Sequence, residues 1–120
     1  MGNVFSLDSL REELEKQYAP TQLDIGTEVI TLRNIVRMPK KDRIKVQDLL
    51  EELGEIQKNE GHTEDQVTEA VQNVLVATAE TVAKGQKLLK AIGDDVPLLM
   101  QVFDRWCAGE DLGEASDSPS

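Results

Sequence analysis

Only one stretch of this chain alternates apolar and polar residues with the period of two that is typical of a β-strand. Leu23 and Ile25 alternate with polar residues, and a second alternating run follows the turn residues Gly26 and Thr27. Because a two-stranded hairpin by itself is only marginally stable in water, it must pack on helices or pair with another chain. The sequence therefore predicts a mostly α-helical fold with one β-hairpin at about residues 21–32, whose strand edge is exposed.

Elsewhere the apolar residues recur at steps of three and four, as in amphipathic helices, and this pattern predicts four to five helices. Ser6 is a suitable N-cap for the first helix, which Pro20 ends. Pro39 suits the first turn of the second helix. That helix is expected to run to about Gln57, with Ile44 on its apolar face.

The longest apolar pattern predicts a third and central helix, capped by Thr63. The pattern continues past Val82, so we expect Gly85 to kink or end this helix. A further apolar turn follows, and Asp94 or Asp95 is expected to cap the last helix.

The core of this small domain must be mainly aliphatic, because hydrophobic residues make up 39% of the chain and aromatic residues only 3%. Phe103 and Trp106 are half of the aromatic residues, so we expect the last helix to anchor the core. After Cys107 the composition turns to Gly, Glu, Asp, Ser and Pro, which favours disorder. We therefore predict a helical domain at residues 1–107 and a disordered acidic C-terminal tail at residues 108–120.

A formal net charge of −10 counts against nucleic acid as a partner, because such binding depends on Lys and Arg neutralising phosphates. Within this acidic chain, a basic segment holds six of the thirteen basic residues and a single acid, Asp42. Its basic residues are Arg33, Arg37, Lys40, Lys41, Arg43 and Lys45. The segment is either a solvated helix face or a docking surface for an acidic partner, including the acidic tail of another copy.

The first helix has a narrow apolar stripe formed by Leu7, Leu10 and Leu14. A stripe of this width predicts a helix that packs on one side only, against a partner or a second copy, so a homo-oligomer stays open. No apolar run approaches the roughly twenty residues of a membrane span, so no membrane partner is expected.

The residue types needed for common catalytic and metal sites are nearly absent. His62 is the only histidine and Cys107 the only cysteine, which excludes a multi-histidine metal site and an intrachain disulfide. The glycines never take the spacing of a phosphate-binding loop. We therefore expect no enzyme activity, no cofactor and no metal.

Three passages carry a resemblance to a known family. They are NVFSLDSLREELEKQYAP, EVITLRNIVRMPKKDRIKV and GQKLLKAIGDDVPLLMQVFDRWCAGEDLGEASDSPS. In this order, and over nearly the whole chain, they resemble the tail assembly chaperones of actinobacterial siphophages. Residues 32–41 are similar to that family's L-R-N-hydrophobic-hydrophobic-R-hydrophobic-P-K-K-like passage. Residues 93–100 are similar to its G-D-D passage, which precedes an acidic, Ser-rich tail.

The resemblance implies a non-enzymatic protein of the host cytoplasm that binds the long, aggregation-prone tape measure protein. It would hold that protein while the major tail protein polymerises around it. In such phages a programmed frameshift near the end of the gene also yields a longer form, which is a further expected partner. The resemblance does not assign partner-binding residues, so the candidates stay the basic segment, the leucine stripe and the hairpin edge.

A second class of function stays open from the residues alone. The chain would then be a small acidic regulatory protein, either antitoxin-like or a nucleic-acid-mimicking inhibitor that occupies a basic site. The basic segment counts against pure mimicry, because a mimic should be acidic across its docking face.

Overall fold

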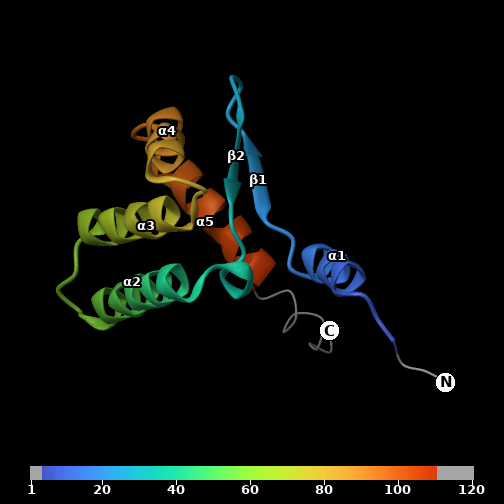
Figure 1. The fold of residues 1–120 in the computed structure, drawn as a ribbon. Coiled ribbons are helices and arrows are strands. Elements are labelled where there is room, and N and C mark those ends of the chain that lie inside the picture. Colours follow the sequence, from blue (N-terminus) through green and yellow to red (C-terminus); the bar gives the residue numbers. More distant parts are fainter. Residues whose placement is uncertain (1–3, 111–120) are drawn as a thin grey trace, which may run out of the picture.

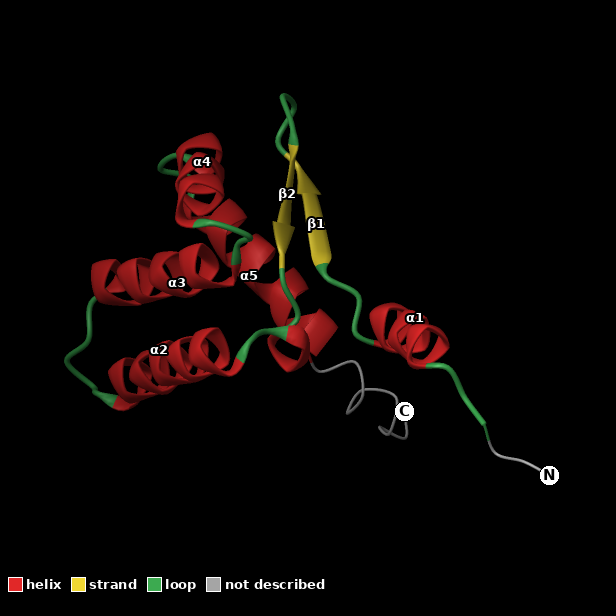
Figure 2. Ribbon diagram, in the orientation of Figure 1, coloured by secondary structure: helices red, strands yellow, loops and turns green. Residues whose placement is uncertain are grey.

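The computed structural model describes residues 4–110, which form five α-helices and one two-stranded antiparallel hairpin (Figures 1 and 2). The elements are, in order, α1 (Leu7–Gln17), β1 (Thr21–Asp24), β2 (Val29–Leu32), the 3-10 helix η1 (Ile35–Arg37), α2 (Lys40–Lys58), α3 (Glu64–Thr78), α4 (Val82–Ile92) and α5 (Val96–Glu110). This confirms the predicted helical fold and the position of its hairpin.

Helix α3 is the centre of the helical body. It packs against α2, α4 and α5, and Figure 1 shows α2 and α3 as an antiparallel pair. The hairpin stands beside this body, with β2 in contact with α4 and β1 in contact with α5. Helix α1 lies on the far side of the hairpin, apart from the other helices (Figure 1).

The core is aliphatic apart from Trp106, whose side chain is 2% exposed. Helix α3 supplies Val71, Val74 and Leu75, none of which is exposed to solvent. Strand β2 supplies Ile30 and Leu32, which are also fully buried and lie on one face of the hairpin. The hairpin is therefore stabilised by packing on the helices, as expected for an element that is marginal alone.

Several predicted helix ends are confirmed. Ser6 caps α1, and its side chain accepts a hydrogen bond from Ser9 N. Thr63 caps α3 in a capping box with Gln66. Asp95 rather than Asp94 caps the last helix, accepting from Leu98 N at 3.1 Å. Pro39 is the N-cap residue of α2, one position before the first turn in which the sequence placed it.

The predicted continuation of the third helix past Val82 is wrong, because α3 ends at Thr78. Ala79 leaves the helix in an extended conformation and forms a β-bridge with Leu32. Glu80 N then donates to Thr31 O at 3.2 Å. The segment after α3 thus pairs with the end of β2, and this tertiary pairing overrides the helical pattern of the sequence.

The predicted kink or end at Gly85 is also wrong, because this glycine lies inside α4, which Thr81 caps. A Cβ atom on Gly85 would lie 2.8 Å from the Cα of Val76 in α3. Glycine is required there because the two helices approach closely, and the helix continues through it.

Helix α5 continues to Glu110, so it includes Ala108 and Gly109, which the sequence assigned to the tail. The sequence also predicts that the acidic tail is disordered. Residues 111–120 of that tail lie outside the described part of the chain, so for them this stays a prediction.

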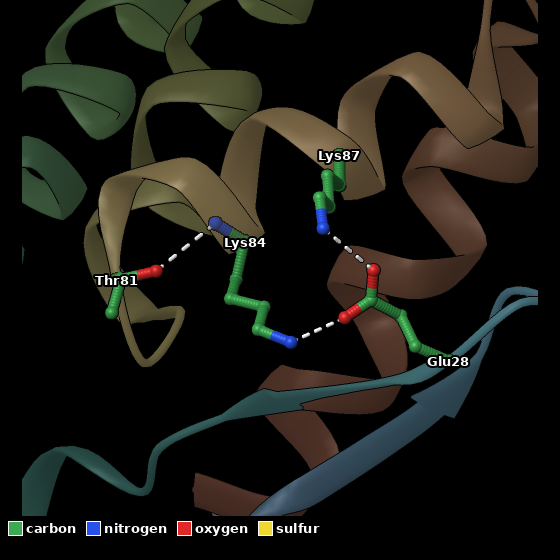
Figure 3. Close-up of polar contacts among 4 residues, drawn as sticks. All are labelled: Glu28, Thr81, Lys84 and Lys87. Carbon is green, nitrogen blue, oxygen red and sulfur yellow. Dashed lines mark hydrogen bonds and ion pairs between the residues drawn. The ribbon is translucent and has the colours of Figure 1, made fainter.

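The tip of the hairpin is held to α4 by a three-residue ion cluster (Figure 3). The carboxylate of Glu28 accepts from Lys87 Nζ at 3.0 Å through one oxygen and from Lys84 Nζ through the other. The hydrogen bond from Lys84 lowers the pKa of Glu28, and the same bond raises the pKa of Lys84. Both shifts show that the folded chain favours the charged pair.

The substitution Glu28→Gln should lower the melting temperature at pH 7. Because the pKa of Glu28 is lowered on folding, its contribution is present above its ordinary value of 4.5 and is lost as pH falls through the folded pKa. The pKa of Lys84 is raised on folding from its ordinary value of 10.5. The contribution of this ion pair is therefore full below pH 10.5 and is lost as the pH rises through the folded pKa of Lys84. Melting curves should therefore show a gap between wild type and variant near pH 7 that closes in acid.

The control is Glu51→Gln on the exposed face of α2, which removes a carboxylate without an ion pair among the described residues. A gap for Glu28→Gln no larger than that of this control would contradict the ion cluster.

The substitutions Gly85→Ala and Gly54→Ala should have opposite effects, although both place alanine inside a helix. A Cβ on Gly54 has nothing within 4 Å, so alanine there should stabilise α2 by about 0.5–1 kcal/mol. The Cβ on Gly85 must push α4 away from α3, which should cost about 1–3 kcal/mol. Urea unfolding measures both, and a Gly85→Ala protein as stable as wild type would exclude the close crossing.

Candidate partner-binding surfaces

Five of the six predicted basic residues lie close together in the chain, at the end of η1 and in the first turns of α2. We call Arg37, Lys40, Lys41, Arg43 and Lys45 the basic surface. Arg43 is half-buried and the other four are exposed. Within residues 4–110, none of the five forms an ion pair with an acidic side chain. Their charge is therefore not neutralised by an ion pair within this part of the chain.

This surface also exposes apolar side chains. Val36 is 49% exposed and Ile44 is 46% exposed. The sequence placed Ile44 on the apolar face of its helix together with Val46 and Leu53, but only those two residues are buried and Ile44 is exposed. The surface thus combines cations with apolar area, which suits an amphipathic partner better than a purely ionic one.

The position of these cations is unfavourable for the helix itself. Lys40 and Lys41 lie in the first turn of α2, where the helix dipole favours acids. Each such charge costs a few tenths of a kcal/mol, up to about 1 kcal/mol. Since neither lysine has an ionic partner in the described chain, stability of the fold does not explain them.

The sixth predicted residue, Arg33, is held inside the fold and its side chain is 28% exposed. Its guanidinium forms an ion pair with Asp42 at 2.9 Å. It also donates to the carbonyl oxygens of Ala77 at 3.0 Å and Thr78 at 3.2 Å. These carbonyls end α3, where a positive charge is favourable. Arg33 therefore links β2, α2 and α3.

The backbone of Arg33 adds a fourth element to this junction. The indole Nε1 of Trp106, in α5, donates to Arg33 O at 3.0 Å. Arg33 N donates to Thr78 O at 2.9 Å. The sequence showed the charge of Arg33 but not this role, because its partners lie up to 73 positions away in the chain.

The leucine stripe of the first helix is uncovered in the described chain. Helix α1 has no buried residue, Leu7 is 67% exposed and Leu10 is 38% exposed. Leu14 is half-buried. The stripe is thus a second candidate surface, and it is apolar where the first is mainly cationic.

An open cleft of about 810 Å³ lies between the end of α1 and the base of the hairpin. Glu15 and Tyr18 line it on one side, and Arg33 and Arg37 line it on the other. The end of α1 and the start of the basic surface therefore border one depression.

The two strands of the hairpin differ in whether their outer edges pair with another segment. Within residues 4–110, β1 pairs only with β2. The end of β2 pairs in addition with Ala79. The exposed edge predicted from the sequence is therefore that of β1.

The described residues contain no group of three His, Cys, Asp or Glu side chains that would hold a metal ion. Nor is any helix in this part of the chain both long and apolar enough to cross a membrane. His62 lies in a loop, with Nδ1 2.7 Å from Asn59 O, and Cys107 is half-buried in α5.

Comparison with known proteins then identifies the family. The model of the mycobacteriophage tail assembly protein family matches residues 1–115. The chain belongs to this family. The match includes the leucine stripe, the hairpin and the basic surface.

Two relatives come from Mycobacterium phage L5. Tail assembly protein Gp24 is 29% identical, and the match covers 100% of both chains. Tail assembly protein Gp25 is 30% identical over 94% of this chain but only 46% of its own length. No solved structure matches the chain. The family names support a role in phage tail assembly and confirm the resemblance seen in the sequence.

The substitution Arg33→Met should lower the free energy of unfolding by about 2–4 kcal/mol, because it removes three charge-assisted hydrogen bonds from a partly buried junction. Arg37→Met is the matched control in the basic surface and should change stability by about 0.5 kcal/mol or less. Urea unfolding of both variants is the measurement. Equal effects would contradict the different roles that the structure gives the two arginines.

Proposed function

We propose that this tail assembly protein is a non-enzymatic chaperone that binds the tape measure protein and keeps it soluble in the host cytoplasm. The observation that carries the proposal is a pair of surfaces that are exposed among residues 4–110, namely the basic surface with Val36 and Ile44 and the leucine stripe of α1. A tail assembly protein with surfaces of this kind is suited to hold another protein's helices.

The chemistry of the two surfaces fits an amphipathic helical client. Helix-in-groove recognition uses apolar side chains at helical spacing, with charges at the rim. The leucine stripe would cover apolar faces of the tape measure protein, and the basic surface would bind its acidic residues. A net charge of −10 would keep the resulting complex soluble.

We also propose a longer form of this protein, made by a programmed frameshift, and the major tail protein as further partners. The relative Gp25 supports the longer form, because the region it shares with this chain is only 46% of its length. A shared segment joined to an additional one would produce this pattern. Both forms would then carry the same binding surfaces.

Co-expression with the tape measure protein of the same phage tests the chaperone function. We expect soluble tape measure protein only when this chain is present, and co-purification of the two. Reversing three charges of the basic surface, by Arg37→Glu, Lys40→Glu and Lys41→Glu together, should reduce the soluble fraction several-fold because it removes the complementary charge.

The matched control reverses Lys58, Lys90 and Arg105, which are exposed elsewhere on the fold and give the same change in net charge. This control should retain the soluble tape measure protein. An insoluble tape measure protein in the presence of the wild-type chain would refute the chaperone function, and equal losses with both triple variants would refute the basic surface as its site.

A further inference from the structure

Helix α1 is too short to be stable without a covering surface. It has 11 residues and none of them is buried. Helices shorter than about 12–15 residues are marginal in water, and most helical stability in proteins comes from packing an apolar face. Leu7 and Leu10 are also more exposed than an apolar stripe of a packed helix would be. Within residues 4–110, α1 therefore lacks the packed apolar face from which a helix of this length gains its stability.

Within residues 4–110, the same chain leaves the apolar stripe of α1 exposed at Leu7 and Leu10. Only three residues connect Gln17 to Thr21, and the connection includes Pro20. It holds the end of α1 beside the hairpin, where Glu15 and Tyr18 border the open cleft. The N-terminal end of α1 lies on the side of this helix that is farther from the helical body (Figure 1).

The charge of α1 indicates the chemistry of the surface that would cover it. The helix carries four acidic residues and two basic ones. Glu13 and Glu15 lie about 100° to either side of Leu14 around the helix, so there is an acid on each side of the apolar stripe. Arg11 lies closer to the stripe than Glu15, but it is already paired with Asp8 at 3.3 Å. The complementary surface is thus cationic with exposed apolar side chains at its centre.

The basic surface has this composition. Ile44 lies three and four residues from Lys41 and Lys40, so the three side chains share one face of α2. On η1, the exposed apolar residue Val36 likewise stands next to a basic residue, Arg37. None of the basic side chains has an acidic partner in the described part of its own chain.

We propose that α1 of one copy docks on the basic surface of a second copy. Leu7, Leu10 and Leu14 pack on Ile44 and Val36, and Glu13 and Glu15 pair with the surrounding cations. A reciprocal exchange places the two α1 helices on the two basic surfaces, which closes the assembly as a two-fold dimer. The dimer is a property of the free protein and does not depend on the tape measure protein.

A charge-exchange experiment on the purified chain tests this dimer. The first variant makes the basic surface acidic, by Arg37→Glu, Lys40→Glu and Lys41→Glu. The second makes α1 basic, by Glu12→Lys, Glu13→Lys and Glu15→Lys, and leaves the Ser6 cap intact. The masses in solution are measured by size-exclusion chromatography with light scattering, for each variant alone and for an equimolar mixture.

The wild type should be a dimer, and each variant alone should be a monomer because like charges then face each other. The mixture should restore a dimer, since both of its contacts again join opposite charges. The reversal of Lys58, Lys90 and Arg105 is the control and should stay dimeric. A monomeric wild type, dimers of both variants alone, or a mixture that stays monomeric would each overturn the proposal.

Circular dichroism establishes that the variants are folded. If a triple reversal prevents folding, the milder pairs Lys40→Gln with Lys41→Gln and Glu13→Gln with Glu15→Gln replace it. Each pair should weaken the dimer about ten-fold, and more salt should weaken the wild-type dimer in the same direction. Pairs with the dissociation constant of the wild type would overturn the proposal.

Discussion

The structure depends on the junction at Arg33, where the hairpin enters the helical body. The guanidinium of this residue closes the carbonyl end of α3 and pairs with Asp42 in α2, while its carbonyl oxygen accepts from Trp106 in α5. One residue thus fixes the relative positions of four elements that are distant in the sequence. Since the side chain is only 28% exposed, these interactions are little screened by water. Without them, the end of β2 would have no polar attachment to α3 beyond the backbone pairing at Thr78 to Glu80.

That backbone pairing explains why α3 and α4 are separate helices. The apolar pattern continues from α3 into α4 and by itself favours one long helix. Instead, Arg33 N donates to Thr78 O at the end of α3 and Glu80 N donates to Thr31 O in β2, and α4 begins at the Thr81 cap. The change of direction brings Gly85 against Val76 and places α4 where Lys84 and Lys87 reach Glu28. The same backbone pairing therefore ends α3 and attaches the hairpin to the helical body.

The local parts of this fold could be predicted from the sequence, and the long-range parts could not. Helix caps such as Ser6 and Thr63, and the hairpin turn, depend on residues within a few positions of one another. The end of α3, the need for Gly85 and the role of Arg33 depend on contacts made only after the chain has folded. The same division applies to the candidate site. Charge and periodicity identified the basic segment and the leucine stripe, but only burial could separate Arg33 from Arg37 and place Ile44 in solvent.

Two features of the free chain are unfavourable in isolation, and they are complementary to each other. Lys40 and Lys41 oppose the dipole of α2, and α1 is a short helix without a buried side chain. An acidic helix packed across the start of α2 would remove both unfavourable features. Its carboxylates would compensate the positive charge of the two lysines, and its leucines would be buried. In the free protein α1 of a second copy would be that helix. A segment of the tape measure protein with the same acidic and apolar pattern would compete for the same surface, so self-association and client binding would be mutually exclusive at each basic surface. A tape measure segment bound at the basic surface would displace α1 of the second copy. The leucine stripe of that α1 would then be exposed and available to the tape measure protein as well.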